Sequence, residues 1–282
     1  MTTDKDPKDV DARLGTESRR LLDDMNDLIA RARLLLLERG RARAPGIPAM
    51  PVSPGTLGAV LYARPQRPVA PESEWLALVR AVAARDGFAL HALGERTQGL
   101  ARTLIERITG RSDTAEELTL AVLHEVWRQA DGYDAARDGS VLGWIMNLAR
   151  EKAVAARRDP ERIQSAVPAN PALSLVARQA PRWSEPPWET VAPGISVKLF
   201  ATDSEKQRVS MLVRLAPGTD YPPHTHAGVE ELHLLDGELW IDDRKLYAGD
   251  YNRAEPGTAD KRVWSETGCA CVLVTSTQDL LS

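Results

Sequence analysis

The chain of 282 residues has little cysteine, only Cys269 and Cys271. Two thiols supply no disulfide framework, and a Cys-x-Cys pair within a strand is poorly placed to form a bridge. Their spacing puts them on one side of a strand, which favours small core residues over a redox or metal-binding pair. A cytosolic protein is the default expectation for such a composition.

Long hydrophobic runs are also absent. No run approaches the roughly 20 apolar residues of a membrane span, and the stretch 34–37 is far too short. The charged N-terminus, Met-Thr-Thr-Asp-Lys, lacks the apolar centre of a signal peptide. We therefore expect a cytoplasmic protein with no membrane partner.

Charge of one sign is not in excess, since the net charge is only -4. Arginine is dense in the first 160 residues, whereas the last third is acidic, so the overall charge says little about nucleic acid. The hydrophobic content of 43% and charged content of 27% are ordinary for a globular protein. At this length two domains can each bury a core.

The pattern His224-x-His226-x3-Glu230-x6-Gly237 places three metal-ligand side chains within seven residues. In a strand, residues two apart share a face, so the imidazoles of His224 and His226 point the same way, and Glu230 returns on a neighbouring strand. Two imidazoles and a carboxylate are a typical ligand set for a divalent metal. The alternative is a polar turn between two strands.

The residues around this pattern resemble the cupin superfamily. Pro217-Gly218 with the His-His-Glu-Gly pattern is similar to its first motif, and Gly249-Asp250 with Glu255-Pro256-Gly257 is similar to its second. The run 223–231 and the segments 248–250 and 265–269 most resemble ChrR-like anti-sigma factors. This resemblance, over about 186–276, implies a small β-barrel that binds zinc or a similar ion.

One ligand position departs from the cupin pattern. The second motif usually ends in a histidine, and Asp260 stands at that position here. Aspartate can complete a shell with two nitrogen and two oxygen ligands, which suits Zn, Fe(II) or Mn(II), or it can bind a metal-bound water. We expect zinc foremost. His233 lies three residues past Glu230, so we predict that it faces the other side of the strand, at a surface or interface.

Helical periodicity organises the first part of the chain. An amphipathic helix is predicted from Glu17 to about Arg39, followed by a Pro/Gly-rich linker at 41–72. Four further helices are predicted between Glu72 and Arg158, with breaks near Asp86-Gly87, at Gly110 and at 131–140. The fold class is thus an all-α helical bundle followed by a C-terminal β-barrel. The predicted parts are a tail, helix and linker at 1–70, a helical domain at 71–160, a linker at 161–185 and a cupin at 186–282.

The helical domain carries a second resemblance. The blocks at 113–119, 126–134 and 139–150 are similar to region 2 of extracytoplasmic-function (ECF) RNA polymerase sigma factors. The resemblance implies that Glu116 and Glu117 face polymerase. It implies that another group of residues lies near opened promoter DNA: Tyr133, Arg137, Trp144, Asn147, Arg150 and Lys152. Aromatic rings can stack on unpaired bases and arginines can contact phosphates, although such residues also occur in cores and on solvated faces.

Two features depart from the sigma pattern. A Gln-Glu pair expected on the third helix of the domain is replaced by Leu120 and Ala121, which removes a polar contact with polymerase. No region 4 follows Arg158, because the cupin stands where the second promoter-reading domain should be. The His/Cys zinc motif that begins ChrR-like anti-sigma factors is also missing.

The favoured hypothesis is a transcription regulator that couples a metal-binding sensory cupin to a sigma-like domain. Its expected partners are core RNA polymerase and, weakly, single-stranded promoter DNA; a sigma or anti-sigma partner and a homo-oligomer stay open. The alternative is a metal-dependent cupin enzyme of the dioxygenase or isomerase type. Regulation is favoured because no general acid, base or nucleophile stands out beyond the metal ligands. A third hypothesis is a decoy that binds polymerase or a sigma partner without initiating transcription.

Overall fold

The computed structural model describes residues 53–62, 70–159 and 184–282, which belong to one compact unit spanning 49–282. The helix predicted at 17–39 and nearly all of the linker predicted at 161–185 lie outside these residues. Among the described helices, none combines the length and apolarity needed to cross a bilayer. The boundaries of the predicted domains remain a prediction.

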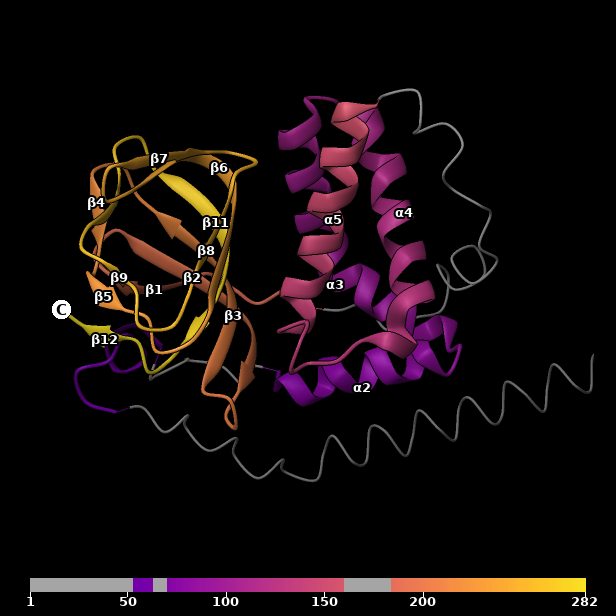
Figure 1. Cartoon of the computed structure of the whole chain (residues 1–282), viewed down its shortest axis with the longest axis horizontal. Coiled ribbons are helices and arrows are strands. Elements are labelled where there is room, and N and C mark those ends of the chain that lie inside the picture. The colour runs from indigo at the N-terminus through magenta and orange to yellow at the C-terminus, as the bar shows by residue number, and fades with distance from the viewer. Residues whose placement is uncertain (1–52, 63–69, 160–183) are drawn as a thin grey trace, which may run out of the picture. The chain divides into compact units, whose positions relative to one another are not determined.

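The helical part consists of four α-helices (Figure 1): α2 (Glu72–Ala83), α3 (Gly87–Thr109), α4 (Ser112–Gln129) and α5 (Val141–Arg158), with the 3-10 turn η2 (Ala130–Gly132) after α4. Local signals set their ends. The side chain of Asp86 accepts hydrogen bonds from the first backbone amides of α3, and Ser140 caps α5 in the same way. Gly110 ends α3 in the left-handed conformation, with φ of 72°. The predicted all-α bundle is confirmed.

The C-terminal part is a curled β-sheet structure (Figure 1), which confirms the predicted cupin barrel. Nine strands form one sheet in the order β1-β2-β3-β11-β6-β10-β4, with β7 and β8 also paired to β6. The small second sheet has the order β12-β5-β9. The strands, in chain order, are β1 (Glu189–Ala192), β2 (Ile195–Asp203), β3 (Arg208–Leu215), β4 (Thr219–Tyr221), β5 (His224–Thr225), β6 (Glu230–Ile241), β7 (Arg244–Tyr247), β8 (Tyr251–Ala254), β9 (Ala259–Asp260), β10 (Val263–Ser265), β11 (Cys269–Ser276) and β12 (Leu280–Leu281).

Two hydrophobic cores share the central strands. Alternate residues of β11, such as Cys271 and Leu273, belong to the core inside the barrel. Between them, Val272 belongs to a second core that continues into the helical bundle. Because both faces of β11 are buried, its sequence reads as an unbroken apolar run rather than an alternating one.

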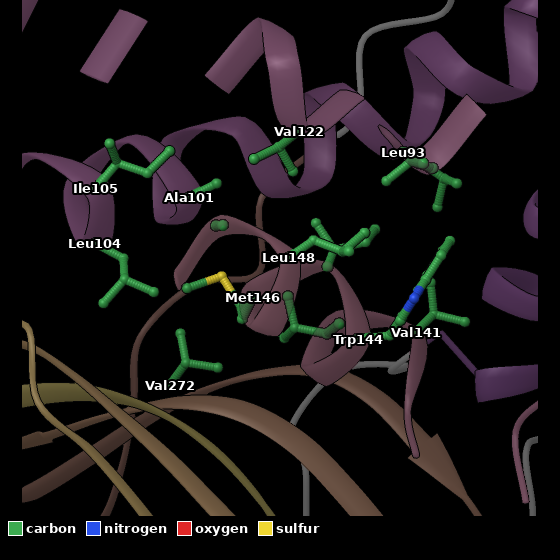
Figure 2. Close-up of a cluster of buried hydrophobic side chains, with 14 of the residues drawn as sticks. Leu93, Ala101, Leu104, Ile105, Val122, Val141, Trp144, Met146, Leu148 and Val272 are labelled. Carbon is green, nitrogen blue, oxygen red and sulfur yellow. The ribbon is translucent and has the colours of Figure 1, made fainter. Parts of the chain in front are cut away.

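The helical bundle packs on the outer face of β2, β3, β6 and β11. Figure 2 shows Val272 of the sheet below Met146 and Leu148 of α5. Both Val272 and Met146 are completely buried. The apolar residues that the sheet contributes to this core are Phe200, Ala201, Leu212, Leu235 and Val272. Burial of apolar area on this scale stabilises the contact at about 25 cal/mol per Å².

Candidate functional site

The four predicted metal ligands come together within the barrel. His224 lies in β5, His226 follows it, Glu230 begins β6, and Asp260 ends β9 directly opposite His224. Their ligand atoms all lie within 4.8 Å of one another. The two histidines and Glu230 are at most 4% exposed, and Asp260 is 9% exposed. These residues form a His/Glu/Asp cluster that could hold a metal ion.

Hydrogen bonds on one side of each imidazole leave the other side free for a metal. His224 Nδ1 lies 2.9 Å from the carbonyl oxygen of Pro222, and His226 Nδ1 lies 2.9 Å from that of Thr258. A carbonyl oxygen only accepts, so both Nδ1 atoms carry a proton. Neither Nε2 atom has a hydrogen-bond partner, although both are buried. Metal-binding histidines are typically oriented by such a bond from their second nitrogen.

The distances between the ligand atoms fit a small divalent ion. The Nε2 atoms of His224 and His226 each lie 3.8 Å from an oxygen of Glu230, and that of His226 lies 3.7 Å from Oδ2 of Asp260. Ligand atoms about 2.0–2.2 Å from a tetrahedral ion are separated by roughly 3.3–3.6 Å. These three separations exceed that range by a few tenths of an ångström, and no pair of ligand atoms in the cluster is more than 4.8 Å apart.

The charges of the cluster are strongly coupled. Burial alone would raise the pKa of Glu230, but the two imidazoles outweigh this effect and hold it at about 2. Burial alone would lower the pKa of His226, but Glu230 and Asp260 raise it to about 9. Burial and the nearby charge of Glu230 raise the pKa of Asp260. A bound metal must displace the imidazole protons, so metal affinity should increase with pH.

Little space adjoins the cluster inside the barrel. A cavity of about 20 Å³ is lined by Tyr221, His224, Glu230 and Asp260 together with apolar side chains of the barrel core. This is room for about one water molecule. Cys269 and Cys271 also line it; they are free and buried, and burial raises the pKa of Cys269 to about 11. Such thiols stay protonated and unreactive at neutral pH, in line with the predicted core role.

Two residues of the predicted DNA-contact group touch the barrel. Asn147 Nδ2 donates to Oε1 of Glu231 at 3.0 Å, and the guanidinium of Arg150 lies 5.0 Å from the ring centre of Tyr251. The Tyr251 hydroxyl donates to the same Glu231 oxygen at 2.8 Å. The barrel thus occupies the side of α5 that the sigma resemblance assigns to DNA.

The other residues of the group are also engaged. Trp144 is 8% exposed and its ring lies 4.8 Å from that of Tyr133, whose hydroxyl donates to the carbonyl oxygen of Gly139. Lys152 pairs with Glu125 of α4 at 3.1 Å, so it faces the bundle. Only Arg137 is exposed, and it pairs with the neighbouring Asp138.

The predicted polymerase-contact residues have the opposite environment. Glu116 and Glu117 are exposed on α4, and the large apolar side chain of Leu120, one turn later, is 44% exposed. No barrel residue is paired with them among the described hydrogen bonds and ion pairs. Among residues 53–62, 70–159 and 184–282, none is therefore found to cover this face of α4.

Sequence reasoning missed three residues that organise these sites. Glu231 and Tyr251 form the polar contact with α5, and Tyr62 approaches the metal cluster from a distant segment. His233, predicted at a surface or interface, is 1% exposed, with its ring 4.9 Å from that of Tyr251 and neither nitrogen hydrogen-bonded. The doubled Glu230-Glu231 was the available signal, because consecutive strand residues face opposite sides.

Comparisons with known proteins support both halves of the chain. Residues 177–278 match the family described as ChrR Cupin-like domain. Over 134 residues the chain is 32% identical to the ECF RNA polymerase sigma factor SigK of Mycolicibacterium vanbaalenii, covering 48% of this chain and 61% of that protein. It is 35% identical over 78 residues to SigK of Mycobacterium tuberculosis, covering 28% of this chain and 41% of that protein.

Solved structures are similar only at a distance. The Rhodobacter sphaeroides SigE in complex with the anti-sigma ChrR is 16% identical with a TM-score of 0.31, over 64% of this chain and 97% of that one. An acetylacetone dioxygenase from Acinetobacter johnsonii is 18% identical with a TM-score of 0.28, over 29% of this chain and 60% of that one.

The family match and the sigma-factor relatives confirm the two resemblances: the chain joins a part similar to ECF sigma factors to a part that matches the ChrR Cupin-like domain family. It spans about three fifths of the length of the SigK protein from Mycolicibacterium vanbaalenii.

Proposed function

We propose that this protein is a transcription regulator in which the cupin holds the sigma-like domain in a closed state. In that state the barrel holds Asn147 and Arg150, two of the residues expected near promoter DNA, while the residues expected to contact polymerase are open. The observation that carries the proposal is the pairing of Asn147 and Arg150 with Glu231 and Tyr251 of the barrel, while Glu116 and Glu117 remain exposed. A protein in this state would bind core polymerase without engaging the opened strand.

The cupin would act as the sensory part through its metal centre. The free Nε2 atoms of His224 and His226, with the carboxylates of Glu230 and Asp260, would hold one divalent ion, zinc foremost. When bound, the ion supplies a fixed positive charge that keeps the carboxylates ionised and the imidazoles neutral. The protein supplies orientation, through the Pro222 and Thr258 carbonyls, and exclusion of solvent.

A direct route joins the metal centre to the closed contact. Glu230 and Glu231 are consecutive residues of β6 and their side chains leave opposite faces of the strand. Glu230 points to the metal cluster, and Glu231 accepts hydrogen bonds from Asn147 and Tyr251. A change in metal occupancy that shifts the start of β6 would thus alter the contact with α5.

The free-energy difference needed to shift the protein from the closed to the open state is modest. Moving a two-state equilibrium from about 1:99 to 99:1 requires a differential binding energy of about 5.5 kcal/mol. Loss of the hydrogen bonds at Glu231 would contribute about 1.5–3 kcal/mol each, because its carboxylate is charged. The apolar contact around Val272 and Met146 and the polar contacts of Arg107 in α3 with Leu235 and Asp236 supply the rest of the stability that the signal must overcome.

The alternative of a cupin enzyme receives less support. The cavity of about 20 Å³ beside the metal cluster has room for about one water molecule and none for an organic substrate. The third hypothesis, a polymerase-binding decoy, corresponds to the same closed state without a signal that opens it.

The experiment compares two tyrosine variants of the full-length protein. Tyr251→Ala removes both the ring beneath Arg150 and a hydrogen bond to Glu231, without removing a proposed ligand. Tyr247→Ala is the matched control, because Tyr247 is 59% exposed on the same barrel. We expect Tyr251→Ala to bind a single-stranded promoter oligonucleotide at least about tenfold more tightly than the parent, about 1.4 kcal/mol.

The control should match the parent, and all three proteins should bind core polymerase equally. Equal oligonucleotide affinity in the parent and Tyr251→Ala would contradict the closed state. Failure of all three to bind polymerase would contradict the regulatory role.

A further inference from the structure

A short segment well upstream of the barrel completes its core. Residues Ser53–Tyr62, here called the strap, include the π-helical turn η1 (Gly58–Tyr62). Three of its side chains, Leu57, Leu61 and Tyr62, are at most 4% exposed and belong to the core inside the barrel. The strap lies within the stretch predicted as a Pro/Gly-rich linker, so its packing adds a structural role to that stretch.

The strap extends the small sheet that carries two of the metal ligands. Leu281 N of β12 donates to the carbonyl oxygen of Gly55 at 2.9 Å, and Leu57 N donates to that of Asp279 at 2.8 Å. β12 in turn pairs with β5, where Leu281 lies opposite His224, and β5 pairs with β9, where His224 lies opposite Asp260. Backbone pairing thus runs from the strap through β12 to β5 and β9, the strands that carry His224 and Asp260.

Asp279 gives this row a second connection. Its buried carboxylate accepts from the backbone amide of Ala227 at 2.7 Å and from the Thr275 hydroxyl at 2.6 Å. Ala227 follows His226 directly. The residue that receives the strap amide therefore also fixes the backbone beside a metal ligand.

Tyr62 brings a hydroxyl group into the neighbourhood of the metal cluster. The hydroxyl groups of Tyr62 and Tyr221 are hydrogen-bonded to each other, and both side chains are buried. The Tyr221 ring lies 5.8 Å from that of His224, edge to face, and lines the small cavity beside Glu230.

The fit of the strap is close at one glycine. A Cβ atom added to Gly58 would overlap the carbonyl oxygen of Thr277, which accepts the Gly58 amide at 3.1 Å. Backbone atoms cannot give way as a flexible side chain can. Gly58→Ala would therefore displace the strap, although Gly58 is neither a metal ligand nor part of the cavity wall.

We infer that the strap seals the metal pocket and that Tyr62 is a positioning residue, which acts on the site by orienting Tyr221 against His224. The inference rests on the metal centre of the proposed function. With the strap docked, a bound ion is shut off from solvent and exchanges slowly. Release of the strap opens a path, which ties metal exchange to the N-terminal part of the chain.

The test uses full-length protein loaded with Zn²⁺ and challenged with excess chelator. We expect Gly58→Ala to lose zinc at least about tenfold faster than the parent, with the initial zinc content unchanged. Gly99→Ala is the matched control, because a Cβ at this exposed position in α3 meets nothing within 4 Å; its rate should equal that of the parent. Tyr62→Phe, which keeps the ring but removes the hydroxyl, should lie between parent and Gly58→Ala.

A second readout covers the case in which Gly58→Ala does not fold. Amide hydrogen exchange of Leu57 and Gly58 in the parent should be slower with saturating Zn²⁺ than with chelator, because a sealed site links strap docking to occupancy. Equal zinc loss in parent and folded Gly58→Ala, equal amide exchange in the two states, or a parent that binds no zinc would each overturn the inference. The oligonucleotide comparison of Tyr251→Ala does not depend on zinc release, so it separates failure of the closed state from failure of the strap.

Discussion

Two faces of the sigma-like domain differ sharply in their surroundings. On α4, Glu116, Glu117 and Leu120 are exposed. On α5, Asn147 is bonded to Glu231 of the barrel and the guanidinium of Arg150 lies over the ring of Tyr251. Both helices have an inner face in the same core, so burial within the bundle does not explain the contrast. The difference is made by the cupin, and it indicates which of two expected partners, polymerase or DNA, the domain could meet without rearrangement.

The largest effect is expected from removing the two histidines of the metal cluster. His224→Ala combined with His226→Ala removes both nitrogen ligands, so zinc content should fall from about one ion per chain to none in elemental analysis. We expect the rate of amide hydrogen exchange in α5 to change while that in α4 does not, because the contact with Glu231 of β6 is made by Asn147 of α5. Equal zinc content in variant and parent would show that His224 and His226 do not hold the metal.

A charge placed in the apolar contact between α5 and the sheet should separate α5 from the barrel. Val272→Asp puts a carboxylate beneath Met146 without a partner, and an unpaired buried charge costs several kcal/mol. We expect faster hydrogen exchange over Met146–Arg150 and tighter binding of single-stranded DNA, with zinc retained inside the barrel.

The control for that variant is Ala155→Asp, which adds the same charge at an exposed position of α5. It should behave like the parent. An unaltered exchange pattern in Val272→Asp would show that the contact does not hold the two parts together.

A third variant tests the open face. Glu116→Lys with Glu117→Lys reverses two exposed charges, so it should weaken binding to core polymerase by about tenfold, or 1.4 kcal/mol, without changing stability or oligonucleotide binding. Glu205→Lys reverses an exposed charge on the barrel and serves as control. If the control weakens polymerase binding as much, the barrel rather than α4 makes the contact.

The smallest expected effect depends on pH. Burial lowers the pKa of His233 to about 3, and Arg150 acts in the same direction. The ring contacts Tyr251, whose hydroxyl is bonded to Glu231. A group whose pKa is depressed on folding stabilises the folded state above its unfolded pKa, about 6.5 here, and this contribution is lost as pH falls toward 3.

Between pH 7 and 5 the parent should therefore lose about 2 kcal/mol of stability through His233. The metal ligands also titrate, so the quantity to measure is the difference in free energy of unfolding between the parent and His233→Phe. As pH falls, the free energy of unfolding of His233→Phe should increase relative to that of the parent. A difference that stays constant from pH 7 to 5 would mean that His233 is not kept neutral by the closed contact.

The helices and the metal ligands could be predicted because their signals are local. Asp86, Gly110 and Ser140 mark helix ends by backbone chemistry that needs no distant partner. The spacing of His224, His226 and Glu230, with Asp260 at the second motif, likewise predicted a cluster that the structure brings together. Whether it binds metal stays a prediction.

The closed contact and the strap could not be predicted, because their signals depend on residues far away in the chain. Leu57 and Tyr62 lie among prolines and glycines, and the core that receives them is made by barrel residues far along the chain, such as Tyr221, 159 residues after Tyr62. Asn147 and Arg150 look like nucleic-acid contacts in isolation. Their partners Glu231 and Tyr251 look like ordinary polar residues of a strand until the sheet is found to be buried on both faces.

The most direct test of the central claim is co-elution of the unmodified full-length protein with core polymerase and a labelled single-stranded promoter oligonucleotide in one size-exclusion run. We expect the protein to elute with polymerase while the oligonucleotide signal in that peak stays at the level of polymerase alone. Protein that carries oligonucleotide to the polymerase peak without any opening signal, or that fails to elute with polymerase, would contradict it.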